Sequence, residues 1–397
     1  MSMRILVANE ARSGGGGVET YLASVVPALR SAGHDVALLY ANTSAERGPT
    51  TIESPVSWSV KDLGIPAAIA AARAWKPDLC FAHNMRYLDI EEAIVGAWPT
   101  VKMMHAYAGA CLSGHKAFSW PSLDACARPC DAGCLVHFLP RRCGRLRPDV
   151  MVEQYRWARR QQALFPRYKA MVVASDHMWA EFSRYEGLTG RVTAIPLFTD
   201  GPAAVTSPRS VDVVFLGRLT PLKGADVLLD ALAVTGRALG RRVTAVIAGE
   251  GPMRGALTWK AERLGDDGVV TADVPGWIDA ARRDATLARA SVLALPSRWP
   301  EPFGLVGLEA ARFGVPSVAF DVGGVRTWLT SATNGVLVPP AGGAPALGRA
   351  IASLLSDPAT LARLSAGATA AASRFSTVAH VTSLTHVLAE WRSSGTS

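Results

Sequence analysis

The sequence predicts an α/β protein with two Rossmann-like, doubly wound domains. Short apolar runs typical of buried parallel strands alternate with helical patterns, and this alternation occurs in two successive series. A polar, proline-containing link, residues 202–209, separates the two series. A chain of 397 residues is also long for one domain. We therefore predict one domain at residues 1–200 and a second from residue 201 onward.

The composition favours a globular protein over a membrane-spanning or disordered one. Apolar residues make up 49% of the chain. No apolar run approaches the roughly 18 residues of a membrane span. The first residues, Met1 to Val7, lead directly into a strand and lack the pattern of a signal peptide. We therefore expect a cytoplasmic protein.

The first series opens with a glycine-rich turn between a strand and a helix. An apolar strand at residues 4–9 precedes four glycines, and a helical pattern at 18–30 leads to a second strand at 36–40. The dinucleotide fingerprint GxGxxG fails here because its third position is Glu19. The second strand also ends without an acid for a ribose, so a dehydrogenase is disfavoured. Gly16 and Gly17 instead indicate close approach of the backbone to a ligand.

Two histidines stand at strand exits of the first domain. His83 follows the strand at 79–82, and His105 follows the strand at 100–104. Ligands of open α/β sheets bind beyond the carboxyl ends of strands, so either side chain could face a ligand. A structural role is the alternative for each. His105 is the better candidate because small residues follow it.

Five of the six cysteines fall within 33 residues of an insertion at about 105–147. In a cytoplasmic protein this clustering favours a metal over disulfides. Three of the cysteines are spaced Cys-x3-Cys-x3-Cys, which is looser than a zinc knuckle, so reduced or disulfide-linked cysteines remain the alternative. The candidate ligands of a structural zinc ion are any four of Cys111, Cys126, Cys130, Cys134 and Cys143.

The segment from Leu139 to Lys169 is strongly basic. It holds nine Arg or Lys against two acids, with apolar and aromatic residues interleaved. One interpretation is a solvated helix face. The other is a surface that meets an anionic acceptor or anionic lipid at the inner face of a membrane. Nucleic acid is disfavoured because no recognisable nucleic-acid module accompanies the charge.

The second series begins with a strand that leads into two cations. The strand ends at Gly217, and Arg218 and Lys223 straddle the following turn. Two cations beyond a strand end suit a diphosphate leaving group. The later expected strands lie at 243–248, 269–270, 274–277, 291–296, 315–320 and 335–338, and two helices, 346–355 and 378–391, end the chain.

Two glutamates flank a strand-to-helix turn after the strand at 291–296. Glu301 lies in the turn, and Glu309 lies in the helix that follows. The backbone amides of Phe303, Gly304 and Leu305 lie between them and are free donors for an anion. A phosphate on these amides, with a carboxylate on either side for hydroxyl groups, suits a sugar nucleotide.

These motifs extend over nearly the whole chain. Their types and their order resemble those of the retaining, family-4 type glycosyltransferases. The resemblance is carried by Gly16-Gly17-Val18-Glu19, Phe215 to Leu219 with Lys223-Gly224, Gly249-Glu250-Gly251-Pro252, Pro296-Ser297, Glu301 to Glu309, and Gly323-Gly324. It implies the GT-B fold, in which two Rossmann-like domains face each other across a cleft. It also implies that the second domain, residues 201–376, binds the donor, and that residues 377–397 form a helix packed on the first domain.

The resemblance implies a role for each matched residue. Arg218 and Lys223 would neutralise the donor diphosphate, and His105 would lie near the reacting carbon. Glu301 would hold the donor sugar and Glu309 the ribose. The remaining donor contacts would come from Gly16, Gly17, Gly251, Trp277, Ile278, Phe303, Gly304 and Leu305.

The cysteine insertion is similar to one in part of this family, in which a cysteine follows the strand of the catalytic histidine and three more come later. In this sequence Cys130 and Cys134 are both candidates for the third cysteine of that pattern. The segment Arg298-Trp299-Pro300, between Ser297 and Glu301, departs from the family pattern.

The activity implied is metal-independent transfer of a hexose-type sugar from a nucleoside-diphosphate sugar to an acceptor hydroxyl, with retention. No Asp-x-Asp motif stands in a suitable loop, so no catalytic cofactor is expected. The acceptor would be a glycan, a lipid-linked molecule or a small molecule, as in bacterial surface polysaccharide or glycoconjugate synthesis. Two alternatives are a non-catalytic sugar-nucleotide-binding subunit and a sugar-phosphate synthase or phosphorylase of the same fold.

Overall fold

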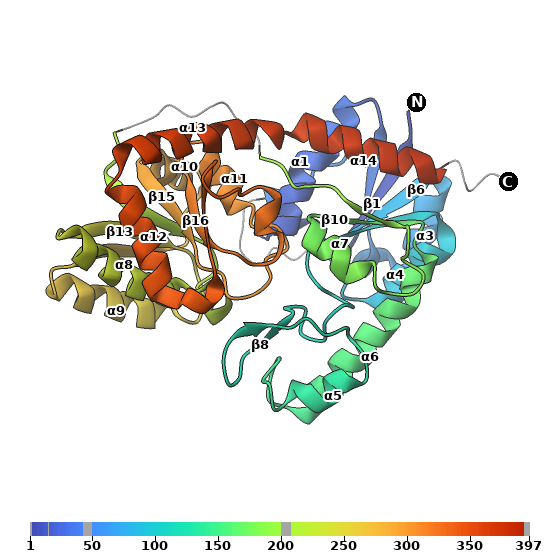
Figure 1. The fold of residues 1–397 in the computed structure, drawn as a ribbon. Coiled ribbons are helices and arrows are strands. Elements are labelled where there is room, and N and C mark those ends of the chain that lie inside the picture. Colours follow the sequence, from blue (N-terminus) through green and yellow to red (C-terminus); the bar gives the residue numbers. More distant parts are fainter. Residues whose placement is uncertain (1, 15, 43–49, 200–207, 393–397) are drawn as a thin grey trace. The chain divides into compact units, whose positions relative to one another are not determined.

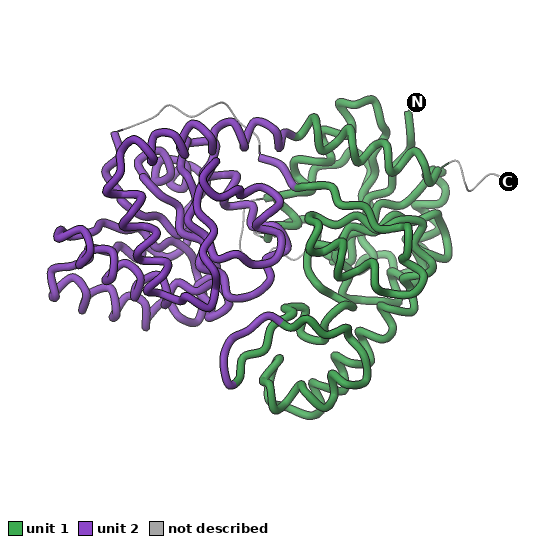
Figure 2. The backbone as a smooth tube through the Cα atoms, viewed as in Figure 1, with its two compact units in different colours: residues 1–120, 126–196, 377–397 green, residues 121–125, 197–376 purple. Residues whose placement is uncertain are grey.

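The computed structural model describes residues 2–14, 16–42, 50–199 and 208–392, which form two compact units. Unit 1 comprises residues 1–120, 126–196 and 377–397, and unit 2 comprises residues 121–125 and 197–376 (Figure 2). Gly15 of the glycine-rich turn and residues 202–207 of the predicted link lie outside the described residues.

The core of unit 1 is a parallel sheet of seven strands among the described residues (Figure 1). Its strand order is β11-β10-β7-β6-β1-β3-β5. The strands are β1 (Arg4–Ala11), β3 (Asp35–Asn42), β5 (Ser57–Ser59), β6 (Leu79–Ala82), β7 (Thr100–Met104), β10 (Ala170–Val173) and β11 (Val192–Ala194). The inner strands are buried along their length, as their continuous apolar runs require. The chain runs from β1 to β3 on one side and from β6 onward on the other, so the order reverses between β1 and β6.

Helices cover this sheet and complete unit 1. They are α1 (Gly17–Ser31), α2 (Val60–Leu63), α3 (Ile65–Ala74), α4 (Leu88–Ala97), α6 (Pro148–Leu164), η1 (Phe165–Arg167), α7 (Asp176–Phe182) and α14 (Thr377–Arg392). A small antiparallel pair, β2 (Ser13–Gly14) and β4 (Thr50–Thr51), lies beside α1. The insertion carries β8 (Ala117–Phe118), β9 (Asp124–Ala125) and α5 (Gly133–Phe138).

Unit 2 is built on a second parallel sheet, with the order β14-β13-β12-β15-β16-β17. The strands are β12 (Val211–Leu216), β13 (Val243–Ala248), β14 (Val270–Gly276), β15 (Ala290–Leu295), β16 (Ser317–Phe320) and β17 (Gly335–Val338). The order reverses between β12 and β15, which places the crevice of this sheet at their carboxyl ends.

The helices of unit 2 bury apolar stripes against the sheet. They are η2 (Pro221–Lys223), α8 (Ala225–Leu239), α9 (Arg254–Asp266), α10 (Ala280–Ala288), α11 (Val306–Ala311), η3 (Gly323–Thr327), η4 (Pro340–Gly342), α12 (Gly343–Leu355) and α13 (Pro358–Arg374). None of the helices in the described part of the chain is long and apolar enough to cross a membrane.

Two sequence expectations need correction. The chain ends with three helices rather than two, because α13 lies between the two expected ones. The expected segments 269–270 and 274–277 are replaced by one strand, β14, which runs from Val270 to Gly276 and whose register against β13 shifts between Val246 and Ala248.

Candidate active site

The candidate site of unit 2 lies where the strand order reverses. Gly217 and Arg218 follow β12, and the segment Ser297 to Glu301 follows β15. Gly249, after β13, must be glycine because a Cβ there would lie 1.8 Å from the carbonyl oxygen of Gly217. The close approach of these strand ends places Arg218 at the crevice. Its side chain is exposed and has no partner among the described residues.

Glu301 is the most strongly held side chain of this site. It is 3% exposed, and its Oε1 accepts hydrogen bonds from Lys223 Nζ (2.5 Å), Ser297 Oγ (2.5 Å) and Trp299 Nε1 (3.0 Å). Burial alone would raise its pKa, but Lys223 and the two neutral donors outweigh burial and lower it. Glu301 is therefore a fixed carboxylate. Its other oxygen, Oε2, accepts no hydrogen bond from the residues that the structure describes.

The turn after Glu301 leaves three amides without a hydrogen-bond acceptor in the described part of the chain. The N–H groups of Phe303, Gly304 and Leu305 donate to no other described residue. Gly304 has φ +85°, a conformation that favours glycine. The carbonyl of Phe303 accepts from Trp328 Nε1 at 2.7 Å, which fixes the turn.

Glu309 in α11 has an ion-pair partner that the sequence analysis missed. Its Oε1 lies 2.8 Å from Arg283 Nη1 of α10, and its side chain is 23% exposed. Burial raises the pKa of Glu309, and Arg283 offsets only part of that effect. No local pattern connects two residues 26 positions apart, so the sequence held no signal for this pair.

Arg283 also lines a pocket of about 230 Å³ together with several predicted site residues and their neighbours. The lining includes Arg218, Trp277 and Ile278, together with Gly217 and Gly249. Trp277 is 60% exposed, so its ring is available to a ligand. The structure thus brings Arg218, Trp277 and Ile278 together. Gly251, predicted for the donor, approaches the carbonyl of Leu219 instead, where a Cβ would lie 2.3 Å away.

His105 and His83 are hydrogen-bonded to each other in unit 1. They follow the neighbouring strands β7 and β6, and His83 Nδ1 lies 3.0 Å from His105 Nε2. Burial, with Lys102 and His380 as further causes, lowers the pKa of His105 to about 3. His105 is therefore neutral at physiological pH. His83 Nε2 is buried without a hydrogen-bond partner among the described residues.

The glycine-rich turn leads into α1, whose first turn is exposed at Gly16 and Gly17. A Cβ on Gly16 would lie 2.5 Å from Glu19 Oε2, so that carboxylate reaches back over the turn. Tyr21 in α1 bonds His380 of α14 through its hydroxyl group (2.8 Å). This bond ties the last helix to α1.

The clustered cysteines are free thiols. No group of three or more His, Cys, Asp or Glu side chains in the described ranges could hold a metal ion. The Sγ of Cys134 donates to the carbonyl of Pro129 at 3.7 Å. The neighbouring Cys134 thiol and burial raise the pKa of Cys130, and the neighbouring Cys130 thiol lowers that of Cys134. The structural zinc site stays a prediction, and no catalytic step is assigned to it.

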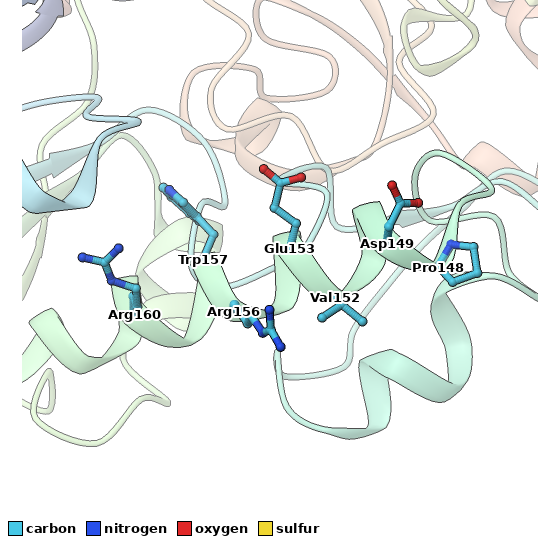
Figure 3. A pocket seen from close by; sticks show the side chains of 7 residues that line it. All are labelled: Pro148, Asp149, Val152, Glu153, Arg156, Trp157 and Arg160. Atoms are coloured by element: carbon cyan, nitrogen blue, oxygen red, sulfur yellow. The ribbon is translucent and has the colours of Figure 1, made fainter.

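The basic segment includes all of α6, which borders three pockets among the described residues. Figure 3 shows one of them, about 680 Å³, along the exposed side of the helix. A second pocket of about 370 Å³ lies at the carboxyl ends of β1, β6 and β7. Trp157 lines both.

Comparisons with known proteins identify relatives for part of the chain. The family described as "Glycosyl transferases group 1" matches residues 205–371. A D-inositol 3-phosphate glycosyltransferase of Segniliparus rotundus is 40% identical over 177 residues, which are 43% of this chain and 37% of that protein. The Streptomyces bingchenggensis protein of the same name is 33% identical over 214 residues, 51% of this chain and 44% of that protein. The chain thus spans less than half the length of these relatives.

Solved structures share the fold over the whole chain. HepE of Anabaena, solved with UDP and glucose, has a TM-score of 0.69 at 21% identity and covers 98% of this chain and 99% of its own. Sucrose-phosphate synthase of Thermosynechococcus elongatus has a TM-score of 0.68 at 19% identity, with 99% and 100% covered. These likenesses confirm the predicted GT-B fold.

Proposed function

We propose that this chain, whose residues 205–371 match the group 1 glycosyltransferases, transfers a hexose-type sugar from a nucleoside-diphosphate sugar to an acceptor hydroxyl. The observation that carries the proposal is the state of Glu301. One of its oxygens is saturated by three donors while the other has no partner among the described residues. A buried, ionised acceptor of this kind suits the hydroxyl groups of a donor sugar.

The diphosphate of the donor would lie at the strand ends beside Arg218. The unpaired guanidinium and the free amides of Phe303 to Leu305 would stabilise charge that develops on the departing phosphate. Lys223, which is ion-paired with Glu301, would also stabilise the negative charge of the departing phosphate. Glu309, held by Arg283, would accept hydrogen bonds from the ribose.

The reaction would retain the configuration of the transferred sugar. The bond from the anomeric carbon to the phosphate oxygen breaks, and the bond to the acceptor oxygen forms on the same face. The acceptor proton passes to an oxygen of the leaving phosphate. Glu301 orients the sugar and forms no covalent bond, and neutral His105 donates or accepts a hydrogen bond near the reacting carbon. These steps need no metal ion, because Arg218, Lys223 and the amides supply the compensating charge.

The first donor to test is UDP-glucose, because HepE of the same fold has been solved with UDP-glucose. Thermal-shift titration should show stabilisation by UDP and UDP-glucose, and an assay of UDP release should show turnover. Arg218→Ala should lower turnover by about 10²–10³, the cost of one lost transition-state donor. Arg237→Ala is the matched control, because Arg237 is also exposed in unit 2 and has no side-chain partner among the described residues. Equal turnover of the two variants would contradict the assignment.

The same assays separate the two alternatives. A non-catalytic binding subunit would bind UDP-glucose but release no UDP with any acceptor or with water. A sugar-phosphate synthase would release UDP only with a phosphorylated sugar. Sucrose-phosphate synthase shares the fold, so fructose 6-phosphate belongs among the acceptors tested.

We also propose that the insertion contacts anionic membrane lipid, in keeping with synthesis of a surface polysaccharide or lipid-linked glycan. Two apolar side chains, Val136 (71% exposed) and Leu146 (58%), lie near the exposed cations Arg142 and Arg145 in sequence. Apolar residues among exposed cations suit an anionic bilayer surface. Binding to liposomes should rise with the fraction of anionic lipid, and an absence of this dependence would remove the proposal.

A further inference from the structure

Trp299 contacts two charged side chains of the unit 2 site. Its Nε1 donates to Glu301 Oε1 at 3.0 Å, and Lys223 Nζ lies 5.2 Å from the centroid of its ring. The second distance is within the range of a cation–π interaction. Trp299 is 5% exposed, so both contacts are largely shielded from water. The proposed transfer gives this side chain no role, although it lies in the segment that departs from the family pattern.

The indole N–H completes a set of three donors on one oxygen of Glu301. The other two donors are Lys223 Nζ and Ser297 Oγ, each 2.5 Å from Oε1. A carboxylate oxygen offers about two lone pairs, so Oε1 has no capacity left for a ligand. Rotation of the carboxylate would break all three hydrogen bonds. The three donors therefore leave Oε2 as the oxygen of Glu301 that a ligand can reach.

The main chain on either side of Glu301 is held as well. Arg298 N donates to the carbonyl of Leu222 at 2.8 Å, which joins the segment of Trp299 to η2. From the turn after β16, Gly324 N donates to the carbonyl of Glu301 at 2.7 Å. Side chain and main chain are fixed together, so the carboxylate cannot move to follow a ligand. A ligand has to bring its hydroxyl group to Oε2.

A fixed acceptor discriminates between sugars that differ in one hydroxyl group. An ionised carboxylate only accepts hydrogen bonds, so a sugar without a hydroxyl group at Oε2 leaves a buried oxygen unpaired. Sites built around such a hydrogen bond reject the analogue that lacks it. A carboxylate that is free to rotate would reach a neighbouring hydroxyl group and would discriminate less. The indole donor to Oε1 therefore bears on which sugar binds.

The ring of Trp299 acts on the second charged group of the site. The ammonium group of Lys223 can donate three hydrogen bonds, and one of them goes to Glu301 among the described residues. The π face of the indole attracts the ammonium group without taking a hydrogen bond from a lone pair. The ring therefore holds the cation beside Glu301 while its other hydrogens stay available to a diphosphate.

We propose that Trp299 is a positioning residue that sets the specificity for the donor sugar. Its N–H fixes Glu301 so that Oε2 selects a hexose with a hydroxyl group at one defined position. Its ring holds Lys223 toward the diphosphate. Trp299 acts through these two side chains and forms no bond with the reacting atoms. This inference rests on the proposed function, because it assumes that Glu301 and Lys223 face the donor.

The test measures the affinity of the full chain for donors by titration calorimetry. The parent donor is the tighter binder of UDP-glucose and UDP-galactose. The probes are its analogues that lack a single hydroxyl group, at C2, C3, C4 or C6, and UDP, which lacks the sugar. In the unaltered chain one of the four analogues should bind much more weakly than the others. That analogue identifies the hydroxyl group at Oε2.

Two variants separate the contacts of Trp299. Trp299→Phe keeps a ring and removes the N–H, so the penalty for the weakest analogue should shrink by about tenfold, which is about 1.4 kcal/mol in binding free energy. The penalties for the other three analogues should change less. Trp299→Leu also removes the π face, so it should weaken the binding of UDP itself by a further two- to fivefold, roughly the range of one cation–π contact.

Two controls distinguish positioning from a general loss of stability. Leu354→Ala opens a cavity in the core of the same unit, in α12, and should leave the penalty for the weakest analogue unchanged. In chains that already carry Glu301→Gln, adding Trp299→Phe should not change that penalty either, because the effect of the indole N–H passes through the carboxylate.

The outcomes separate this inference from the proposed function. An unchanged penalty in Trp299→Phe, an equal change in Leu354→Ala, the same change with Glu301→Gln present, or four analogues that bind alike would each overturn the role of Trp299. Expected affinities without release of UDP would support that role and contradict the proposed transfer. An unaltered chain that binds neither UDP nor its sugars would contradict the proposed function, and this inference with it.

Discussion

Replacing Lys223 by Ala should destabilise unit 2 as well as stop turnover. The ammonium of Lys223 is the only cation paired with Glu301 among the described residues, and the two side chains are 19% and 3% exposed. Removing one partner of a buried ion pair costs about 3–5 kcal/mol, and the partial exposure of Lys223 favours the lower end, about 3 kcal/mol. For a unit of this size that equals a fall of about 6–12 °C in Tm. The sequence alone predicted a loss of turnover with an intact fold.

The destabilisation should depend on pH in a defined direction. In the unaltered chain the pKa of Glu301 lies below its ordinary value, although burial opposes this, because Lys223, Ser297 and Trp299 favour the carboxylate. A carboxyl group with a lowered pKa adds stability above its unfolded pKa and loses it as the pH falls through its folded pKa. Without Lys223, burial raises the pKa of Glu301, and the carboxyl group takes up a proton at a higher pH. The gap in Tm between the two proteins should therefore be widest near neutral pH and narrow as the pH falls below about 5.

The assay is thermal unfolding from neutral to acidic pH for Lys223→Ala, Glu301→Gln and the double variant. The double variant should unfold at a higher temperature than Lys223→Ala, because a neutral amide needs no buried counterion. It should remain without turnover of UDP-glucose. A Tm for Lys223→Ala equal to that of the unaltered chain at neutral pH would refute the reasoning, and so would a double variant no more stable than Lys223→Ala.

Three further predictions concern the donors to Glu301, the helix that follows it and the cysteine insertion. Trp299→Phe removes one neutral donor to Glu301 Oε1 and keeps the ring, so it should cost about 1.5–3 kcal/mol in the free energy of unfolding, and Ser297→Ala should cost a similar amount. The variant with both substitutions should lose more free energy of unfolding than either single variant. An equal loss in the double variant and one single variant would show that only one of the two donors stabilises Glu301. Gly307→Ala would place a Cβ 1.9 Å from the ring of Trp328, so it should cost about 1–3 kcal/mol and weaken UDP binding, as measured by urea unfolding and thermal shift. If the insertion holds a structural zinc ion, metal analysis should find about one equivalent of zinc in protein purified without added metal. Metal-free protein whose five insertion cysteines all react with a thiol reagent would contradict this prediction.

The sheets were predictable because most of their strands read as short, continuous apolar runs, and inner strands such as β6, β7 and β10 are buried along their whole length. Residues 243–248 and 335–338 form strands with the predicted bounds. The helix α13 was missed because its buried face is made mainly of alanines, Ala368, Ala371 and Ala372, which give almost no apolar period. Its start did carry a signal. Asp357 caps the helix by accepting from Thr360 N, and a proline follows it at the first helical position.

The candidate site was predictable where residues are close in sequence and unpredictable where they meet through the fold. The sequence predicted the free amides between the two glutamates correctly, because the first amides of a helix that follows a strand have no acceptor within that helix. The contact of His83 with His105 required knowing that β6 and β7 are neighbours in the sheet. The Arg283–Glu309 pair depends on how α10 packs beside α11, which no spacing along the chain records.

The two glutamates show why motif spacing cannot assign roles alone. They lie eight residues apart and are both largely buried, yet the pKa of Glu301 is lowered and that of Glu309 is raised. The difference comes from outside the turn that joins them. Glu301 gathers an ammonium group and two neutral donors on one oxygen, whereas the cation beside Glu309 is itself shared with Asp284. Glu301 is therefore ionised before any ligand binds. The carboxylate of Glu309 would be stabilised further by hydrogen bonds from the hydroxyl groups of a ligand.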